Sequence, residues 1–213
     1  MSVLSRLPRL LPDPSTATSH SAGRVVVAVH GTLSEPGIFR PLARSLAAQG
    51  VALLAPAHGM RGTAALRVSA ADIARAVTCL PDAVDRVDVV AHSAGAPAAL
   101  KALADPTVRE RVGTLVGLGA AWRGTGPSRY PALLVRALAG DSFTDLAGSP
   151  RAVSTPEGVE VVSVVSTADT VVPLWSARLG RVIELNGVPH NGLVRRTDTV
   201  LSALGLPQPR PAA

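Results

Sequence analysis

One serine stands where its hydroxyl could serve as a nucleophile. Ser93 is the middle residue of the segment 91–95, which reads AHSAG and joins an apolar run to an Ala-rich segment with Pro97 near its start. Proline is tolerated in the first turn of a helix because the N–H that it lacks would have no partner there. A strained strand-to-helix turn lifts a serine above a sheet and needs small residues two positions before and after it. Ala91 and Gly95 meet this need, so the segment predicts a nucleophile elbow with alanine in place of the usual first glycine.

A serine nucleophile requires a base, and the base requires an acid that orients it. In elbow-type sites the chain order is serine, acid and then histidine, each in a loop that follows a strand. Asp169 follows the apolar run 159–165, and His190 follows the run 181–185. Asp169 would accept a hydrogen bond from the imidazole, and His190 would transfer the proton. We therefore predict Ser93, Asp169 and His190 as the catalytic residues.

Other residues fit these roles less well. His58 follows the second apolar run but precedes the serine, and we keep it as an alternative base. The side chain of His92 is expected to point away from the neighbouring serine hydroxyl, and His20 lies in the N-terminal segment. Asp145 is the reserve acid. The five histidines show no close spacing with cysteine or carboxylates, so no metal site is predicted.

Acyl chemistry also requires N–H donors for the oxyanion that forms. The first apolar run ends at His30, and the N–H of Thr32 beyond it could pair with the N–H of Ala94 at the start of the elbow helix. The positive end of that helix dipole would lie at the same place. For His30 we favour a structural role in holding this loop over proton transfer, and we retain it as a candidate substrate contact.

The elements that must position these residues follow a simple pattern. Short β-branched runs alternate with Ala/Leu/Arg segments that end at glycine or proline, as helices do. Most runs are apolar on both faces, which is typical of a parallel sheet covered by helices on each side. The pattern predicts an α/β fold with a doubly wound, mainly parallel six-stranded sheet flanked by helices. The predicted strands are 24–29, 51–55, 87–91, 112–118, 159–165 and 181–185, and the predicted helices are 41–49, 70–80, 96–104 and 192–204.

The chain divides into one domain, 24–205, with a flexible tail at 1–23 and another at 206–213. Residues 121–158 interrupt the alternation, and we predict a crossover helix and a small cap there, with an ordinary crossover helix and a long loop as the alternative. Within this segment Trp122, Tyr130 and Leu134 are candidate substrate contacts.

Composition excludes several classes of protein. With 213 residues, 47% hydrophobic and 17% charged, the chain is suited to one globular domain and not to disorder. No apolar run is long enough to cross a membrane. The net charge of +6 comes from scattered arginines, and with only 2% aromatic residues a nucleic-acid partner is not expected. Pro8 and Pro12 interrupt any secretory signal, and the lone Cys79 fits a reducing compartment, so a cytoplasmic location is expected.

These motifs together resemble the α/β-hydrolase superfamily, in particular the small bacterial lipases and esterases whose elbow reads A-H-S-x-G. The segments 27–32 (VAVHGT), 168–173 (ADTVVP) and 190–193 (HNGL) are similar to that family's oxyanion strand, acid loop and histidine loop. The segment 118–125 is similar to its G-T-P-H-x-G-T stretch, with Ala121 and Trp122 in place of Pro-His. The likeness covers roughly residues 25–204.

The resemblance implies a serine hydrolase that cleaves carboxylic esters through an acyl-enzyme on Ser93, without a cofactor. The alternatives are an acyltransferase that uses the same acyl-enzyme and a non-catalytic ligand-binding member of the fold. The expected partner is a small-molecule or lipid ester, and an apolar cap over 130–138 would suit an acyl chain. The positive charge would favour weak contact with an anionic lipid surface, although Arg136 equally fits a solvated helix.

Overall fold

A computed structural model describes residues 10–15, 23–127, 131–148 and 150–208 of the chain. Six strands form one sheet in the order β2-β1-β3-β4-β5-β6, and every neighbouring pair is parallel, as the sequence predicts. The strands are β1 (Arg24–Val29), β2 (Ala52–Leu54), β3 (Arg86–His92), β4 (Val112–Leu118), β5 (Glu160–Ser166) and β6 (Arg181–Leu185).

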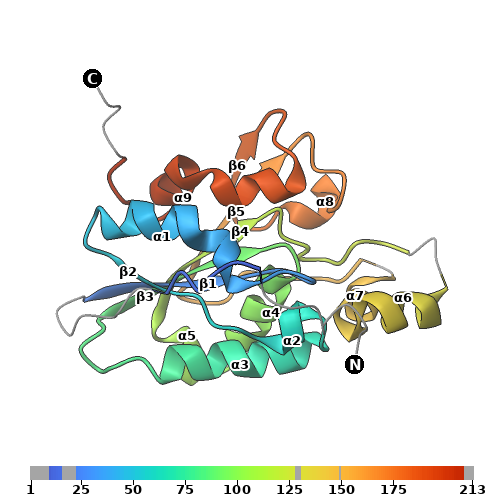
Figure 1. The fold of residues 1–213 in the computed structure, drawn as a ribbon, viewed down its shortest axis with the longest axis horizontal. Helices are drawn as coiled ribbons and strands as arrows, with labels where there is room; N and C mark the ends of the chain where they lie inside the picture. The colour runs from blue at the N-terminus through green and yellow to red at the C-terminus, as the bar shows by residue number, and fades with distance from the viewer. Residues whose placement is uncertain (1–9, 16–22, 128–130, 149, 209–213) are drawn as a thin grey trace.

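Helices cover both faces of this sheet (Figure 1). On one face α3, α4 and α5 pack against the strands through residues such as Ile73, Ala99 and Val108. On the other face α1 and α9 pack through Leu42 and Leu201. The strands are therefore buried on both sides, which explains their continuous Val-rich runs. The helices are η2 (Pro36–Phe39), α1 (Arg40–Ala47), α2 (Gly59–Gly62), α3 (Leu66–Thr78), α4 (Gly95–Ala102), α5 (Pro106–Arg109), α6 (Ala132–Ala139), α7 (Asp141–Leu146), α8 (Leu174–Ala177), η3 (His190–Arg195) and α9 (Thr197–Ala203).

Of the four predicted helices, 41–49 and 96–104 match α1 and α4 to within two residues at each end, and the other two differ more. The helix predicted over 70–80 begins earlier, at Leu66. The helix predicted over 192–204 is two elements, η3 and α9, because Arg196 between them has φ −82° and ψ 62°, outside the helical region. The break lets η3 turn His190 toward the sheet while α9 packs on its face.

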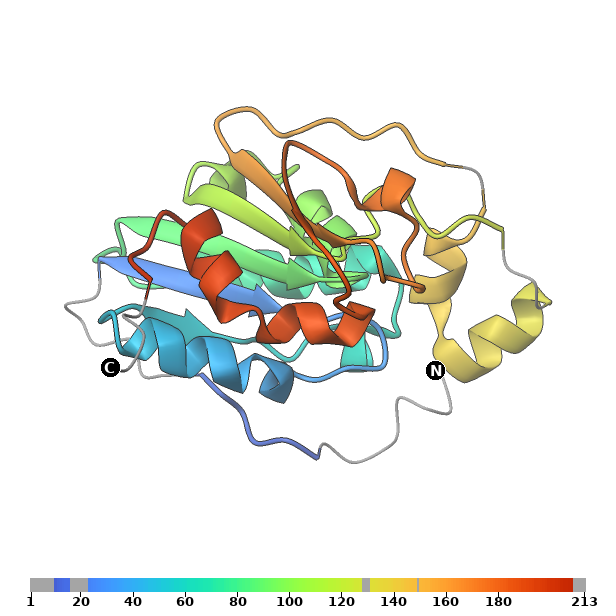
Figure 2. The same cartoon turned by 90° about the horizontal axis from the view of Figure 1, so that it is seen from above.

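The segment predicted as a cap carries α6 and α7, which lie beyond the carboxyl ends of the strands rather than on a sheet face (Figure 2). The backbone N–H of Ser142 donates to the carbonyl of Thr63, and that of Leu66 donates to Asp145, so α7 is tied to the loop before α3. No helix among the described residues is long and apolar enough to cross a membrane.

Candidate active site

The segment around Ser93 forms the predicted elbow between β3 and α4. Ser93 has φ +53°, a left-handed conformation that costs energy for a residue other than glycine. Its backbone N–H donates to the carbonyl of Leu118 at 3.0 Å, which holds the turn against β4. A Cβ at Gly95 would lie 2.5 Å from the carbonyl oxygen of His30, so only glycine allows α4 to approach β1 this closely. The small residue two positions after the serine is thus explained by contact with the neighbouring strand.

Asp169 and His190 form a hydrogen-bonded pair at the carboxyl edge of the sheet. Asp169 lies in the loop after β5, and His190 is the first residue of η3, directly after Pro189. The imidazole Nδ1 lies 2.7 Å from Oδ2 of Asp169. The side chain of His190 is 8% exposed and that of Asp169 is 2% exposed, so water hardly competes with this bond. The structure therefore brings together two residues that lie in separate loops of the sequence.

The surroundings of Asp169 keep its carboxylate charged. Burial by itself would raise the pKa of Asp169, but hydrogen bonds from His190 and from the N–H groups of Val172 and Val171 outweigh it and hold the pKa below 3.8. Both N–H groups donate to Oδ1 at 2.9 Å. A charged carboxylate favours the imidazole tautomer that carries its proton on Nδ1, because this N–H can then donate to Asp169.

Ser93 and His190 line the same cavity, which has a volume of about 1010 Å³. Phe143 and Leu146 of α7 form part of its wall, so the segment 121–158 contributes to the site. Within the described part of the chain the Ser93 hydroxyl makes no hydrogen bond. Catalytic hydrogen bonds are often long before substrate binds, so the absence of a hydrogen bond at this hydroxyl is compatible with a serine nucleophile.

Thr32 and Ala94 also line this cavity. Neither backbone N–H donates to any acceptor among the described residues. Ala94 is the N-cap of α4, so its N–H is at the positive end of that helix. A Cβ at Gly31 would lie 3.0 Å from Cβ of Ser93, which shows how closely the loop before Thr32 passes the serine. Two N–H groups without an acceptor among the described residues thus lie at the cavity that Ser93 lines.

Solved structures show which fold this is, although no family model and no curated protein matches the chain. Lipase B of Aspergillus fumigatus has a TM-score of 0.73 at 18% identity, over 93% of this chain and 56% of that one. A metagenomic carboxyl esterase has a TM-score of 0.60 at 23% identity, over 75% and 53%. A thioesterase domain from the curacin biosynthetic pathway has a TM-score of 0.60 at 17% identity, over 87% and 92%. All three are α/β-hydrolases. The chain has the α/β-hydrolase fold.

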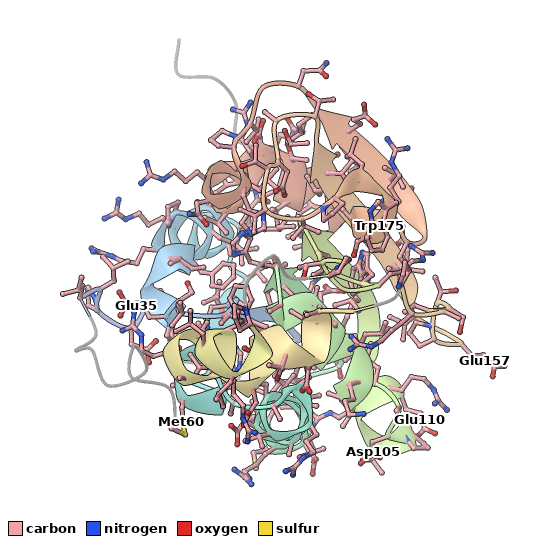
Figure 3. The ribbon with its side chains drawn as sticks, turned by 90° about the vertical axis from the view of Figure 1, so that its right-hand side faces the viewer. Glu35, Met60, Asp105, Glu110, Glu157 and Trp175 are labelled. Atoms are coloured by element: carbon pink, nitrogen blue, oxygen red, sulfur yellow. The ribbon has the colours of Figure 1, made fainter. Side chains whose placement is uncertain are left out.

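The chain spans little more than half the length of the first two of these α/β-hydrolases. The fold inferred from the four sequence motifs is confirmed, with the elbow, acid loop and histidine loop at the carboxyl edge of the sheet. Figure 3 looks onto this edge, where Glu35 lies beside η2 and α1 and Trp175 lies on the opposite side.

His30 and His58 support the loops of this α/β-hydrolase fold. Burial lowers the pKa of His58 to about 4, against the effect of the hydrogen bond that its Nε2–H donates to the carbonyl of His30 at 3.1 Å. The rings of His30 and His58 stack with centroids 4.1 Å apart, and Nδ1–H of His30 donates to the carbonyl of Gly31. Neither ring lines the cavity among the described residues. This placement fits the structural role expected for His30. It does not fit His58 as the alternative base, and it does not fit His30 as a substrate contact.

His92 packs against the proposed base. Its Nε2–H donates to the carbonyl of His190 at 3.3 Å, and the two rings are 4.6 Å apart. Burial, and after it the charge of His190, lower the pKa of His92 to about 3, so this ring stays neutral. His92 therefore fixes the backbone of His190 without adding a charge beside it.

Two residues at the site were not identified from the sequence. A Cβ at Gly119, which has φ +51°, would lie 2.7 Å from Oδ2 of Asp169 and 3.0 Å from Nδ1 of His190. Its position directly after the β4 run was the available signal. Ser142 of α7 is fully buried, and its hydroxyl lies 3.0 Å from that of Thr32. No sequence pattern joins these two hydroxyls, which are 110 residues apart.

Two candidate substrate contacts, Trp122 and Leu134, do not line the cavity. Trp122 is 2% exposed and donates its indole N–H to the hydroxyl of Ser163 in the core, so its assignment as a substrate contact is corrected. Leu134 is 49% exposed on α6 and does not line the cavity, which corrects the same assignment there. Tyr130 lies outside the described residues. The reserve acid Asp145 accepts the N–H of Leu66, and this bond gives it a structural role.

Part of the predicted N-terminal tail belongs to the site. The N–H groups of Leu10 and Leu11 each approach the carboxylate of Glu35 to 3.0 Å, and Glu35 also pairs with Arg61. Leu11 lines the cavity. Residues 10–15 are therefore hydrogen-bonded to the domain through Leu10, Leu11 and Ser15.

Proposed function

We propose that this protein is a serine hydrolase that cleaves carboxylic esters through an acyl-enzyme on Ser93. The observation that carries the proposal is the buried 2.7 Å bond between Asp169 and His190, in which His190 lines the same cavity as the strained elbow serine. The similarity to a lipase, a carboxyl esterase and a thioesterase domain supports acyl chemistry in general.

In the proposed reaction, Nε2 of His190 accepts the proton of the Ser93 hydroxyl while Oγ bonds to the acyl carbon. The carbonyl oxygen becomes an oxyanion that accepts hydrogen bonds from the N–H groups of Thr32 and Ala94. The imidazolium then donates its proton to the leaving alkoxide as the ester C–O bond breaks. Water repeats the sequence on the acyl-enzyme, so that a carboxylic acid leaves and Ser93 regains its proton.

Asp169 stabilises the imidazolium in both steps. Its negative charge is maintained by the hydrogen bonds to Oδ1 and by the low pKa described above. Because the pair is almost fully buried, the attraction between carboxylate and imidazolium is screened little by water. The same carboxylate selects the Nδ1–H tautomer, which is the one that can accept the serine proton.

The test is hydrolysis of a short p-nitrophenyl ester together with labelling by a fluorophosphonate probe. Ser93→Ala is expected to lower kcat by about 10⁶-fold and to abolish labelling, because the nucleophile is lost. Ser202→Ala, at an exposed position of α9, is the matched control and keeps both activities. Undiminished turnover in folded Ser93→Ala would refute the proposal, as would failure of the wild-type serine to react with the probe. Product analysis with a competing alcohol separates hydrolysis from acyl transfer.

A further inference from the structure

Three arginine residues are among those that line the cavity that holds Ser93 and His190. Arg40 and Arg44 lie four residues apart on α1, a spacing that places them on one face of the helix. Arg195 belongs to η3, which contacts α1. All three residues are exposed to solvent.

No carboxylate of the described residues neutralises these three charges. All fifteen Asp and Glu residues of the chain lie in the ranges that the structure describes, and none of them lines the cavity. None is within ion-pair distance of Arg40, Arg44 or Arg195. Pairing is common for the other arginines of the described chain. Those with a carboxylate partner are Arg24, Arg61, Arg75, Arg86, Arg136, Arg178 and Arg181.

Like charges four residues apart on a helix repel and destabilise it. A third charge from η3 on the same cavity adds to this repulsion. An anion between the three side chains would remove it, and the planar guanidinium fork matches the oxygen geometry of carboxylate and phosphate groups. Unpaired arginines that face a cavity are therefore suited to an anionic ligand.

Apolar residues of α7 and of the loop after β5 form another part of the cavity wall. Phe143 and Leu146 of α7 and the adjacent Val171 and Val172 contribute to it. Leu146 and Val172 pack in one cluster with Ala94, whereas the buried residues of α1 and η3 pack in a different cluster. The apolar wall and the arginine wall thus come from different packing units of the fold.

We propose that the substrate ester carries an anionic group, a carboxylate or a phosphate, which binds Arg40, Arg44 and Arg195. The apolar part of the substrate lies against the wall that contains Leu146 and Val172. This inference rests on the proposed function, because it places the reacting ester at Ser93. It assigns to the cavity a class of amphipathic, negatively charged esters.

The kinetic test compares an ester that carries a terminal carboxylate with its neutral methyl-capped analogue. In one series of substrates the carboxylate is on the acyl side of the ester, and in a second series it is on the alcohol side. The wild type is expected to favour the charged ester of one series by about tenfold in kcat/KM, the sum of three exposed charge contacts. In the triple variant Arg40→Gln, Arg44→Gln and Arg195→Gln this ratio falls to about one. Raising the salt from about 10 mM to about 0.5 M lowers the wild-type ratio, because exposed charges are screened.

Arg67→Gln is the matched control, because Arg67 is exposed on α3 and has no carboxylate partner among the described residues. It keeps the wild-type ratio. Equal use of charged and neutral esters by the wild type in both series would overturn the inference, and so would a ratio that survives in the triple variant. If either result is found while the neutral ester is still hydrolysed, the inference fails but the proposed function stands. Failure of the inference and failure of the proposed function are therefore distinguishable.

A binding measurement tests the same arginines without turnover. Calorimetric titration with hexyl phosphate and with hexanoate compares the phosphate and carboxylate forms of the anion. The ligand that binds the wild type more tightly is expected to bind the triple variant about tenfold more weakly. Unchanged binding overturns the inference. If the triple variant instead loses only adsorption to phosphatidylglycerol vesicles, the arginines serve a lipid surface and the substrate assignment is wrong.

Discussion

Gly119→Ala tests the geometry of the Asp169–His190 pair directly. The added Cβ would lie 2.7 Å from Oδ2 of Asp169, whereas ordinary contact begins at 3.4 Å, so the carboxylate must retreat by about 0.7 Å. Leu193 at 2.9 Å and His190 at 3.0 Å leave little room on the other sides. Misplacement of a catalytic group by about 1 Å can cost about 10²-fold in rate, so we expect kcat to fall between about tenfold and 10²-fold.

The same substitution strains the backbone, because Gly119 has φ +51°. That strain is expected to cost about 1–2 kcal/mol in the free energy of unfolding. Gly50→Ala is the matched control: Gly50 has φ +70°, and a Cβ there meets nothing within 4 Å. Both variants should lose similar backbone stability in urea titrations, and only Gly119→Ala should lose kcat in the p-nitrophenyl ester assay. A folded Gly119→Ala variant with kcat within about twofold of the wild type would show that turnover does not depend on this pair.

The other predictions concern two carboxylates. Asp169→Asn should lower kcat by about 10⁴-fold, because the amide no longer selects the Nδ1–H tautomer. Since the folded pKa of Asp169 lies below 3.8, its charged form contributes stability that is present above that pH and lost as the pH falls through the folded value. The unfolding free energies of wild type and variant should therefore stay apart above about pH 4 and converge as the pH falls below it, and a gap that widens below that pH would contradict the assignment. Asp88 is fully buried in β3 and pairs with Arg24 at 2.7 Å and with Arg86 at 3.2 Å. Asp88→Ala should cost about 2–3 kcal/mol in urea unfolding, because both arginines stay partly hydrated, and should leave kcat unchanged; full stability would show that the pairs contribute nothing.

The sheet was predictable because each strand is a Val-rich run that must be buried on both faces. The bounds of β1, β4 and β6 agree with the prediction to the residue, and the other strands differ at their ends, where hydrogen bonding and hydrophobicity need not coincide. The break at Arg196 was not predictable, because the residues there have no strong breaker among them and tertiary packing decides the local backbone.

The proposed catalytic residues could be placed because chain order and loop position at the strand ends constrain them strongly. Contacts across the cap could not be placed, since they depend on how α7 folds back over the site. Trp122 illustrates the difficulty: a tryptophan beside the site was expected at its surface, but the hydroxyl of Ser163 offers its indole N–H a partner in the core. Likewise, Leu11 was assigned to a tail because its anchor, the carboxylate of Glu35, is 24 residues away.

The two ends of β3 carry separate tasks. Asp88 and its arginines lie near the amino end of the strand, and His92 with the following elbow lies at the carboxyl end. Changes at sites without shared partners tend to act independently. Substitutions near Asp88 could therefore raise thermal stability, and separate substitutions at the cavity could change the esters that are accepted. The two sets of substitutions should interfere little with each other.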